Sequence, residues 1–470
     1  MNEQRRKIEA IIGYLGIVAI SIAACQKLNA LRITDLLFFT VIAGCIGWLA
    51  TRNDRNLMLA VVCVWILSPL LRRMVDWQSG GFRPVTALSV LPLTVTTSLL
   101  VPIYQRFDHF PRWLLQPFLL MGVPTAIAGA YGTLHYGPSS IFETGKWLLP
   151  FLLPFYLVNS DHFPAETPRL LHRLGLVVGA TALYAIFQYA FLPPWDARWL
   201  VESEMTTSMG RPERFSVRVW GTMNACGPAS IIWAFAILLV YAKKQVQFSD
   251  LGVVACCSVA LLISRVRASW AIVVVGIGML LILLGSSLGR KIPLTAIAVA
   301  LIIPLFIFSP AGDEISDRIE TMSDLSSDGS FQTRLSIAET LYEQVWENPF
   351  GYGIGFRSSD KVAGASTKVV AIDNGIGELF YSLGLIGSTS WAVGFLTLVA
   401  QFYRLLTARY RITHELGALV FILSVVMFSR LIINLSLIGL TGVVFWCLIG
   451  LWCSYQTSAS RTLAYSGVPA

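Results

Sequence analysis

The feature that most constrains this chain is a succession of long, unbroken apolar runs. A helix that crosses the bilayer core needs about 20 mostly apolar residues, and only helices or closed barrels satisfy every backbone polar group in lipid. The runs are continuous rather than alternating, so they favour helices. Of the 470 residues, 55% are hydrophobic and 13% are charged, whereas a soluble domain carries about 25% charged residues. We therefore predict an all-α, polytopic membrane helix bundle.

Fourteen runs qualify as candidate spans, and we expect twelve to fourteen transmembrane helices. The run at 147–159 is short and contains Pro150 and Pro154, which predicts a kinked or re-entrant segment. The turn Ser264–Ala268 is tight, so the spans beside it should form a hairpin. The candidate spans cover residues 9–25, 33–50, 57–71, 85–104, 114–134, 147–159, 173–192, 225–242, 251–264, 268–285, 294–309, 373–400, 415–433 and 436–455.

The first span is expected to be an anchor rather than a cleaved signal. Met1–Lys7 is basic, and no small-residue cleavage site follows the apolar run after it. The eight cysteines lie inside spans or at their ends, where they act as small hydrophobic residues rather than as a disulfide or zinc framework. No metal, cofactor or nucleic-acid partner is expected.

The distribution of basic residues predicts the orientation of the chain. Short cytoplasmic loops are usually rich in Lys and Arg. With the N-terminus inside, every cytoplasmic connection is basic, so both termini are predicted to be cytoplasmic. These connections hold Arg52 and Arg55, Arg106 and Arg112, Arg169 and Arg173, Lys243 and Lys244, Arg290 and Lys291, and Arg404, Arg409 and Arg411.

Two long loops then lie outside the cytoplasm. The second contains Phe331–Glu347, whose apolar residues fall on one stripe and predict a short amphipathic helix. Asn348–Pro349 should end this helix. The predicted divisions are N-terminal transmembrane helices (1–192), a first extracytoplasmic loop (193–224), central transmembrane helices with the Ser264–Arg267 hairpin (225–309), a large extracytoplasmic loop (310–372), and C-terminal transmembrane helices with a cytoplasmic tail (373–470).

Four arginines on the outer side are candidate anion ligands. Arg218 closes the first long loop, Arg265 and Arg267 lie at the hairpin, and Arg334 begins the amphipathic helix. The planar guanidinium group suits phosphate or pyrophosphate, because its donor fork grips anions bidentately. These side chains could instead snorkel toward headgroups or pair with acids. A charge so near hydrocarbon is costly and is usually functional.

Asp373 and Glu378 open the span at 373–400 and are candidate general bases. Asp373 could alternatively cap the helix, since Asp is a preferred N-cap residue. The segment NPFGYGIGF at 348–356 precedes them. It follows no strand and does not have the GxGxxG spacing. We therefore interpret its glycines as sharp turns where the chain returns to the bundle.

Four segments between about 215 and 390 resemble, in order, motifs of the O-antigen ligase and Wzy-type polysaccharide polymerase superfamily. They read RVWGTMNACGPAS, SRVRASW, TRLSIAETLYEQVWENPFGYGIG and DNGIGELFYSLGLIG. The resemblance implies a bundle of the membrane glycosyltransferase type C kind in a bacterial inner membrane. Such proteins act outside the cytoplasm on glycans carried by undecaprenyl pyrophosphate. In ligases the last motif begins with His. Here Asp373 takes the place of that His. In this respect the motif is similar to the one in polymerases of exopolysaccharide or O-antigen.

The resemblance implies transfer of a glycan from undecaprenyl pyrophosphate to an acceptor glycan hydroxyl, without a metal. Arg218, Arg265, Arg267 and Arg334 would neutralise the leaving pyrophosphate, and Asp373 or Glu378 would accept the proton. The expected partners are the lipid-linked oligosaccharide, the acceptor glycan and the bilayer, with a chain-length regulator as a further candidate. Three alternatives stay open: a ligase or other lipid-linked glycan transferase, a transporter or flippase with broken helices, and a non-catalytic scaffold.

Overall fold

The structure is a computed structural model that describes residues 3–27, 32–106, 112–160, 162–285, 346, 348–356, 374–407 and 414–466. In these ranges every regular element is a helix and no strand occurs. Eleven of the described helices are long and apolar enough to cross a membrane, and two apolar helices are shorter. This confirms the predicted all-α membrane bundle. The predicted span 294–309 and the predicted amphipathic helix at 331–347 lie outside the described residues, apart from Trp346.

The chain forms two compact units, each built from stretches that are distant in sequence. Unit 1 comprises Met1–Phe107, Ser160–Glu320 and Thr413–Ile422, and unit 2 comprises Asp108–Asn159, Thr321–Ile412 and Leu423–Ala470. The two units are described separately below.

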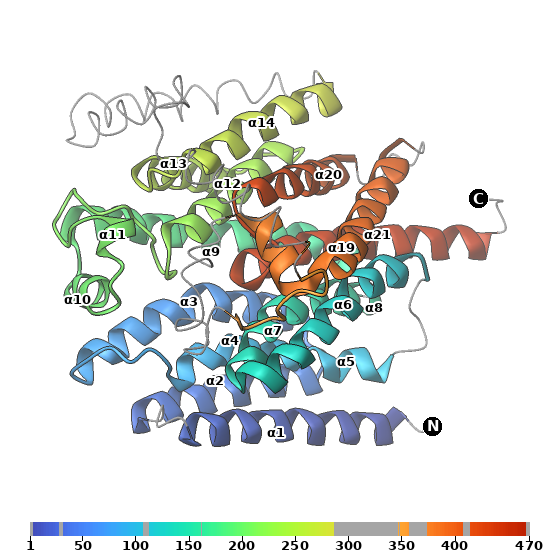
Figure 1. The fold of residues 1–470 in the computed structure, drawn as a ribbon. Helices are drawn as coiled ribbons and strands as arrows, with labels where there is room; N and C mark the ends of the chain where they lie inside the picture. Colours follow the sequence, from blue (N-terminus) through green and yellow to red (C-terminus); the bar gives the residue numbers. More distant parts are fainter. Residues whose placement is uncertain are drawn as a thin grey trace. The chain divides into compact units, whose positions relative to one another are not determined.

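Unit 1 begins with a group of helices that pack on one another: α1 (Glu3–Lys27), α2 (Ile33–Thr51), α3 (Leu57–Gln78), α4 (Ala87–Thr97) and α5 (Leu100–Gln105) (Figure 1). The contact between α1 and α2 is close, because a Cβ atom on Gly47 would lie 2.5 Å from the Tyr14 ring. The Tyr14 hydroxyl donates to the Ala43 carbonyl over 2.8 Å. A buried polar group in a membrane segment is thus satisfied within the protein.

The remaining described helices of unit 1 centre on α9 (Phe163–Phe191) and α12 (Cys226–Ala242). Two short helices, α10 (Pro194–Glu202) and α11 (Thr206–Met209), lie between them in sequence. The helices α13 (Phe248–Ile263) and α14 (Arg267–Leu284) both pack against α12. Only Ser264, Arg265 and Val266 separate α13 from α14, which confirms the predicted hairpin.

Polar contacts gather the loops of unit 1 at two opposite ends of its long helices. At one end Arg173 donates to Asn56 over 3.0 Å, and Lys243 pairs with Asp250 at 2.6 Å. At the other end Arg32 pairs with Asp76 at 2.7 Å. The first end collects connections that the basic pattern predicts to be cytoplasmic, and the second collects connections predicted to be outside. These contacts place the start of α3, the N-terminal part of α9 and the connection between α12 and α13 at one end, and the start of α2 with the end of α3 at the other.

Unit 2 contains α6 (Arg112–Tyr136), α7 (Ser139–Leu148), η2 (Leu149–Phe151), α8 (Leu152–Asn159), α19 (Gly375–Thr407), η6 (Arg430–Ile432), α21 (Gly439–Ser466) and the C-terminal part of α20 (His414–Ser429). The predicted short span at 147–159 is the second half of a longer apolar segment, Ser139–Asn159. The 3-10 turn at Pro150 interrupts it, as expected for a kink at proline. Helix α6 packs on α19, and α8 packs on α21.

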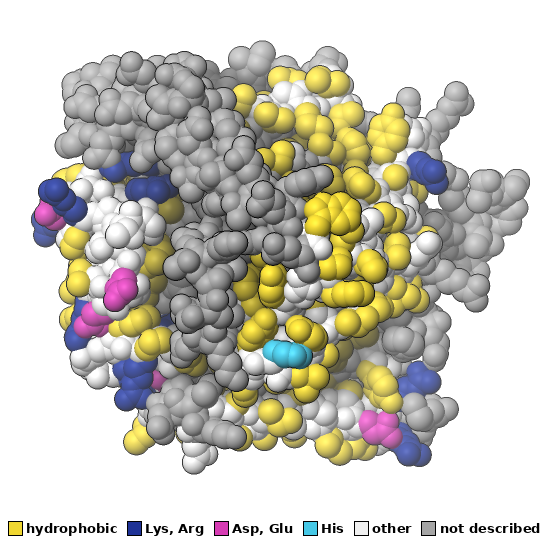
Figure 2. All heavy atoms as spheres, in the orientation of Figure 1, with side chains coloured by type: hydrophobic (Ala, Val, Ile, Leu, Met, Phe, Trp, Pro, Cys, Tyr) yellow, Lys and Arg dark blue, Asp and Glu magenta, His cyan; other side chains and the backbone are white. Residues whose placement is uncertain are grey.

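Hydrophobic side chains cover much of the described surface seen in Figure 2, and charged side chains are few there. Exposed aliphatic side chains include Ile33 at 89%, Leu134 at 84% and Ile282 at 83% exposure. In water such a surface would drive association. In a bilayer the same surface faces lipid tails at no cost.

Candidate active site

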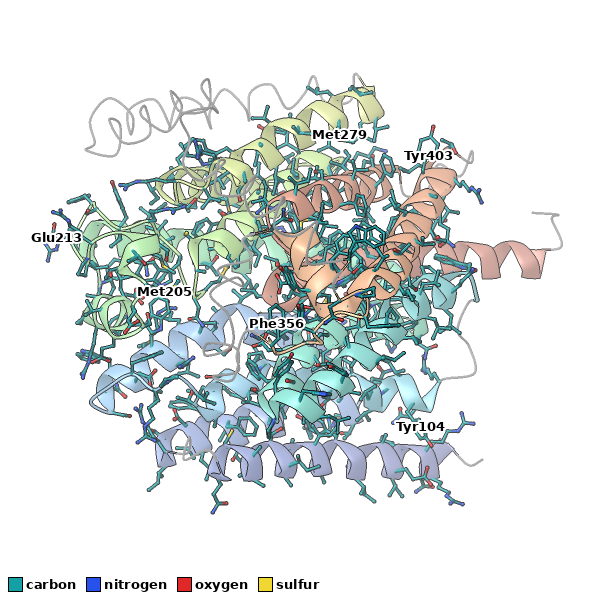
Figure 3. All side chains as sticks on the ribbon, viewed as in Figure 1. Tyr104, Met205, Glu213, Met279, Phe356 and Tyr403 are labelled. Carbon is teal, nitrogen blue, oxygen red and sulfur yellow. The ribbon has the colours of Figure 1, made fainter. Side chains whose placement is uncertain are left out.

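Arg218 ties the first long loop to the hairpin between α13 and α14. It follows α11 in the chain, five residues after Glu213, which Figure 3 labels. Its Nε donates to the Ser264 carbonyl over 3.2 Å, and its Nη2 donates to the Arg265 carbonyl over 3.4 Å. Its Nη1 donates to the Ser208 carbonyl over 3.0 Å. The loop and the hairpin, which are remote in sequence, are therefore held together by one guanidinium group.

The Arg265 side chain, in the hairpin, in turn donates hydrogen bonds to the first long loop. Its Nη1 and Nη2 atoms lie 3.4 Å from the Ser216 and Phe215 carbonyl oxygens, and the residue is 8% exposed. Its backbone has φ +56°, in the left-handed region that glycine adopts readily and other residues adopt at a cost. Strain of this kind collects at functional sites. The turn would be easier for glycine, so the presence of arginine indicates a need for its side chain.

Two helix N-termini meet beside these arginines. Helix α12 begins at Cys226 and α14 begins at Arg267. Near the starts of the two helices, the hydroxyls of Ser230 and Ser269 lie 2.8 Å apart. The positive ends of two helix dipoles therefore lie at the same end of unit 1 as Arg218 and Arg265. A helix N-terminus of this kind attracts anions.

Backbone carbonyl groups hold the guanidinium groups of Arg218 and Arg265 in position. The described hydrogen bonds of both side chains are donated to carbonyl oxygens. Arg267 is the first residue of α14 and follows Arg265 by two positions. Three of the four predicted arginines are thus brought together, whereas Arg334 lies outside the described residues.

A buried ion pair holds the segment between Arg218 and α12 in place. Arg73 on α3 and Asp196 on α10 are fully buried, and their Nε and Oδ1 atoms lie 2.7 Å apart. Arg73 also donates to the Gly221 carbonyl over 2.7 Å and to the Met223 carbonyl. Gln188 on α9 donates to Asp196 over 2.7 Å. This network links α3, α9 and α10 to the chain that enters α12.

The side chain of Gln188 extends the same network to the loop backbone. Its Oε1 accepts the N–H groups of Trp220 and Gly221, each over 3.0 Å. The Thr222 hydroxyl donates to the Ile66 carbonyl over 2.8 Å. Sequence reasoning missed Arg73. The available signal was a pair of adjacent arginines, Arg72 and Arg73, just beyond a predicted span, with a single acidic residue, Asp76, close behind them in sequence.

Removal of Asp196 should destabilise the fold strongly. Asp196→Ala leaves the buried guanidinium of Arg73 without its counter-charge, which costs about 3–5 kcal/mol. The matched control is Glu202→Ala. Glu202 also pairs with an arginine at 2.7 Å, Arg198, but the two side chains are 32% and 37% exposed. An exposed pair contributes about 0–1 kcal/mol. Unfolding in detergent, followed by helix content, measures both; equal losses would contradict the structural role of the buried pair.

The exposed pair is itself well formed, which makes it a fair control. Hydrogen bonds from the Arg198 side chain and the Phe82 backbone N–H lower the pKa of Glu202. Glu202 therefore keeps its negative charge near neutral pH. The two variants differ in burial rather than in charge.

In unit 2, the start of α19 carries the predicted base residues. The Asn374 Oδ1 atom accepts the N–H groups of Ile376 over 2.9 Å and Gly377 over 3.2 Å, so Asn374 is the N-cap. The alternative prediction, that Asp373 is the N-cap, is therefore wrong by one residue: the cap is Asn374. Asp373 itself lies outside the described residues. Glu378 follows in the first turn and is partly exposed.

Helix α19 is not the continuous span that the sequence predicted. Its backbone breaks at Gly384, with φ 69° and ψ −179°. The Leu385 N–H donates to the Pro349 carbonyl over 2.7 Å, and the Tyr381 carbonyl accepts the Tyr352 N–H over 2.6 Å. The backbone groups released at the break are thus satisfied by the glycine segment 348–356, as lipid-embedded backbone requires.

The glycines of that segment make close backbone contacts, which confirms their predicted role as turns. Gly351, Gly353 and Gly355 have φ values of +75°, +81° and +98°. A Cβ atom on Gly351 would lie 2.4 Å from the Gly384 nitrogen. The Ile354 N–H donates to the Ala128 carbonyl of α6 over 3.0 Å. At its end, Phe356, labelled in Figure 3, stacks near Tyr381 at 5.9 Å between ring centroids.

The match to a known family covers the part of the chain just described. Residues 252–392 match a family model described as O-antigen ligase. The matched range contains Arg265, Arg267, Asp373 and Glu378, whereas Arg218 lies ahead of it. No curated protein matches the chain. The family indicates glycan transfer of the O-antigen ligase or polymerase type. The chain is therefore a multi-pass membrane protein in which residues 252–392 match the O-antigen ligase family.

Proposed function

We propose that this protein polymerises lipid-linked polysaccharide repeat units. It would transfer a glycan from undecaprenyl pyrophosphate to a hydroxyl of an acceptor glycan. The observation that carries the proposal is the convergence of Arg218, Arg265 and Arg267 with the N-termini of α12 and α14. Such a group of fixed donors and dipoles suits an anion larger than a carboxylate.

The reaction breaks the bond between the anomeric carbon and the pyrophosphate oxygen and forms a bond from that carbon to the acceptor oxygen. Negative charge develops on the leaving pyrophosphate. Arg218 and Arg265 are held by backbone carbonyls before substrate arrives, so little reorganisation is needed to stabilise that charge. Arg267 and Arg334 would add to this field. Because these cations neutralise the leaving group, the proposal does not require a metal ion.

The proton of the attacking hydroxyl must go to a base. Asp373 or Glu378 would accept it, since a carboxylate within hydrogen-bond reach of the acceptor is a competent base. The loop 310–372 would cover the substrates and select the acceptor. Asp373 stands where related ligases have His, which favours the polymerase branch over the ligase branch.

One observation also fits a transporter. Broken helices are typical of transporters, in which the free backbone groups bind ions or substrate. The break at Gly384 differs from the breaks in transporter helices. Here the Tyr381 carbonyl and the Leu385 N–H are already hydrogen-bonded to the glycine segment. The ionisable residues at the start of α19 also precede the break. We therefore favour transfer over transport.

The proposal is tested with purified protein in proteoliposomes that contain an undecaprenyl-pyrophosphate-linked repeat unit and no added metal. A polymerase gives a ladder of products that grow by one repeat unit. Addition only to a lipid A core acceptor indicates a ligase. Movement of the intact lipid across the bilayer indicates a transporter. Each of the last two outcomes contradicts the polymerase assignment, as does an inactive protein.

We further propose that the arginine end of unit 1 faces the periplasm or exterior of a bacterial inner membrane and that both termini are cytoplasmic. Glu213 and Lys244 are exposed and lie in connections predicted to be on opposite sides. In a cysteine-free background, Glu213→Cys should react with an impermeant thiol reagent in intact cells. Lys244→Cys should react only after the membrane is permeabilised. The reverse pattern would overturn the orientation.

A further inference from the structure

Two tryptophan side chains form an aromatic pair at the end of unit 1 that is predicted to lie outside the cytoplasm. Trp77 lies in the last turn of α3, and Trp195 lies in the first turn of α10. Their ring centroids are 5.9 Å apart, and the ring planes meet at 70°. Trp77 is 41% exposed. Because the two rings meet edge to face rather than in a stack, ring faces are left open to a ligand.

The Trp195 ring is held in place from inside the protein. Its Nε1 atom donates to the Tyr184 hydroxyl over 2.7 Å, and that hydroxyl donates to Asp196 over 2.8 Å. Asp196 is the buried partner of Arg73. A tryptophan that anchors a protein at the membrane interface keeps its polar edge in the wet headgroup layer. The polar edge of Trp195 is instead bound to a buried network, so the protein itself fixes the orientation of this ring.

A half-exposed ion pair lies on the same face of α10 as Trp195. Arg198 follows Trp195 by three positions and Glu202 follows it by seven, which is the spacing of one helix face. The Arg198 Nε and Glu202 Oε1 atoms are 2.7 Å apart, and the side chains are 37% and 32% exposed. Arg198 also donates to the Gly80 carbonyl, and Glu202 accepts the Phe82 N–H over 2.7 Å. These bonds hold the loop that follows α3 against α10.

The tryptophan platform, which consists of Trp77, Trp195, Arg198 and Glu202, combines open aromatic faces with charged hydrogen-bonding groups. The C–H groups of a sugar ring carry partial positive charge and are attracted to the negative face of an aromatic ring. Sugar hydroxyls form charge-assisted hydrogen bonds with guanidinium and carboxylate groups. Lipid tails could use the rings but not the ion pair. Since the family match indicates glycan transfer, the ligand that fits this surface is a glycan.

We infer that the tryptophan platform binds the acceptor glycan. The inference rests on the proposed function, because it names where the acceptor of that reaction is held. The reacting sugar of the donor is joined to the pyrophosphate and so belongs beside the arginines. Arg218 donates to a carbonyl of α11, α11 packs on α10, and α10 carries the platform. The platform is thus separated from Arg218 by one short helix, where sugars that are not joined to that pyrophosphate can lie.

The test is equilibrium binding of a lipid-free oligosaccharide to the purified protein in nanodiscs. The probe is a fragment of a few repeat units, released by mild acid from the surface polysaccharide of the bacterium that encodes the protein. Trp77→Ala should weaken its binding about 10-fold, because a stacking face is lost. The same variant should bind undecaprenyl pyrophosphate as the wild type does. Trp77→Phe keeps an aromatic face and should lose less.

The matched control is Trp48→Ala. Trp48 is 54% exposed on α2, and the Arg52 guanidinium carbon lies 4.3 Å from its ring centroid, so it is also an exposed tryptophan beside an arginine. This variant should bind the oligosaccharide as the wild type does. Unchanged binding in Trp77→Ala, or an equal loss in Trp48→Ala, would overturn the inference and leave Trp77 as a residue of the membrane interface.

A measurement on the wild-type protein keeps the test decisive if Trp77→Ala does not fold. Hydroxyl-radical oxidation of Trp77 and Trp48, followed by mass spectrometry, reports which ring the oligosaccharide covers. Saturating oligosaccharide should slow the oxidation of Trp77 but not that of Trp48. An unchanged rate at Trp77 contradicts the inference. Failure to form a product ladder in the transfer assay instead contradicts the proposed function, so the two failures are distinguishable.

Discussion

Arg265→Gly should leave the protein folded and lower kcat about 100- to 1000-fold. Most arginine variants confuse function with folding, but this position separates the two. Arg265 has φ +56°, which glycine adopts without strain, so the hairpin loses nothing in its backbone geometry. What disappears is the guanidinium group that holds the Phe215 and Ser216 carbonyls and contributes positive charge. The measurements are transfer kinetics and the unfolding midpoint of the same preparation.

Arg265→Lys refines this expectation. Lysine keeps the charge but replaces the planar fork with a single ammonium group, which cannot hold two carbonyls and an anion in the same way. We expect a loss of activity that is large but smaller than that of Arg265→Gly. Arg214→Lys is the matched control, since Arg214 is exposed in the same loop and should tolerate the change. Wild-type transfer by Arg265→Gly at normal protein levels would remove Arg265 from the anion site.

Asp373→Asn should lower transfer about 100- to 10,000-fold if Asp373 is the general base. The structure shows that this variant changes the candidate base without removing the helix cap. Asn374 already caps α19 through the N–H groups of Ile376 and Gly377, so the helix start does not depend on the side chain before it. Asparagine also keeps the size and polarity of the side chain but cannot accept the proton. Stability in detergent should therefore be unchanged while transfer is lost.

Two companion variants decide between the candidate bases. Asp373→His should recover part of the activity, because a neutral imidazole is a competent base near pH 7. Glu378→Gln should retain most of the activity if Asp373 is the base. Full activity in Asp373→Asn, with loss in Glu378→Gln, would transfer the role to Glu378, which lies in the first turn of α19.

The membrane fold could be predicted from the sequence because it depends on the average polarity of long segments. Thirteen of the predicted spans coincide with described apolar helices, and the hairpin at 264–266 lies where the short polar interval predicted it. The kink near Pro150 was also readable, because proline acts on its own helix. Arg218 and Arg265 stood out for a similar reason, as charges next to hydrocarbon.

Features that depend on contacts distant in sequence were not readable. The pair of Arg73 and Asp196 joins residues 123 positions apart, and the pattern around either residue gives no sign of the other. The break in α19 at Gly384 depends on the glycine segment that fills it, so a local apolar run suggested a continuous helix.

The central claim is that Arg218, Arg265 and the converging helix N-termini bind the pyrophosphate of a lipid carrier. Its most direct test is equilibrium binding of undecaprenyl pyrophosphate to the purified protein in nanodiscs, with undecaprenyl monophosphate as the comparison. We expect the wild-type protein to prefer the pyrophosphate, and Arg265→Gly to weaken its binding about 10- to 100-fold, as loss of a charged hydrogen-bond donor implies. Equal binding of the two lipids, or equal affinity in the wild type and the folded Arg265→Gly variant, would contradict the claim.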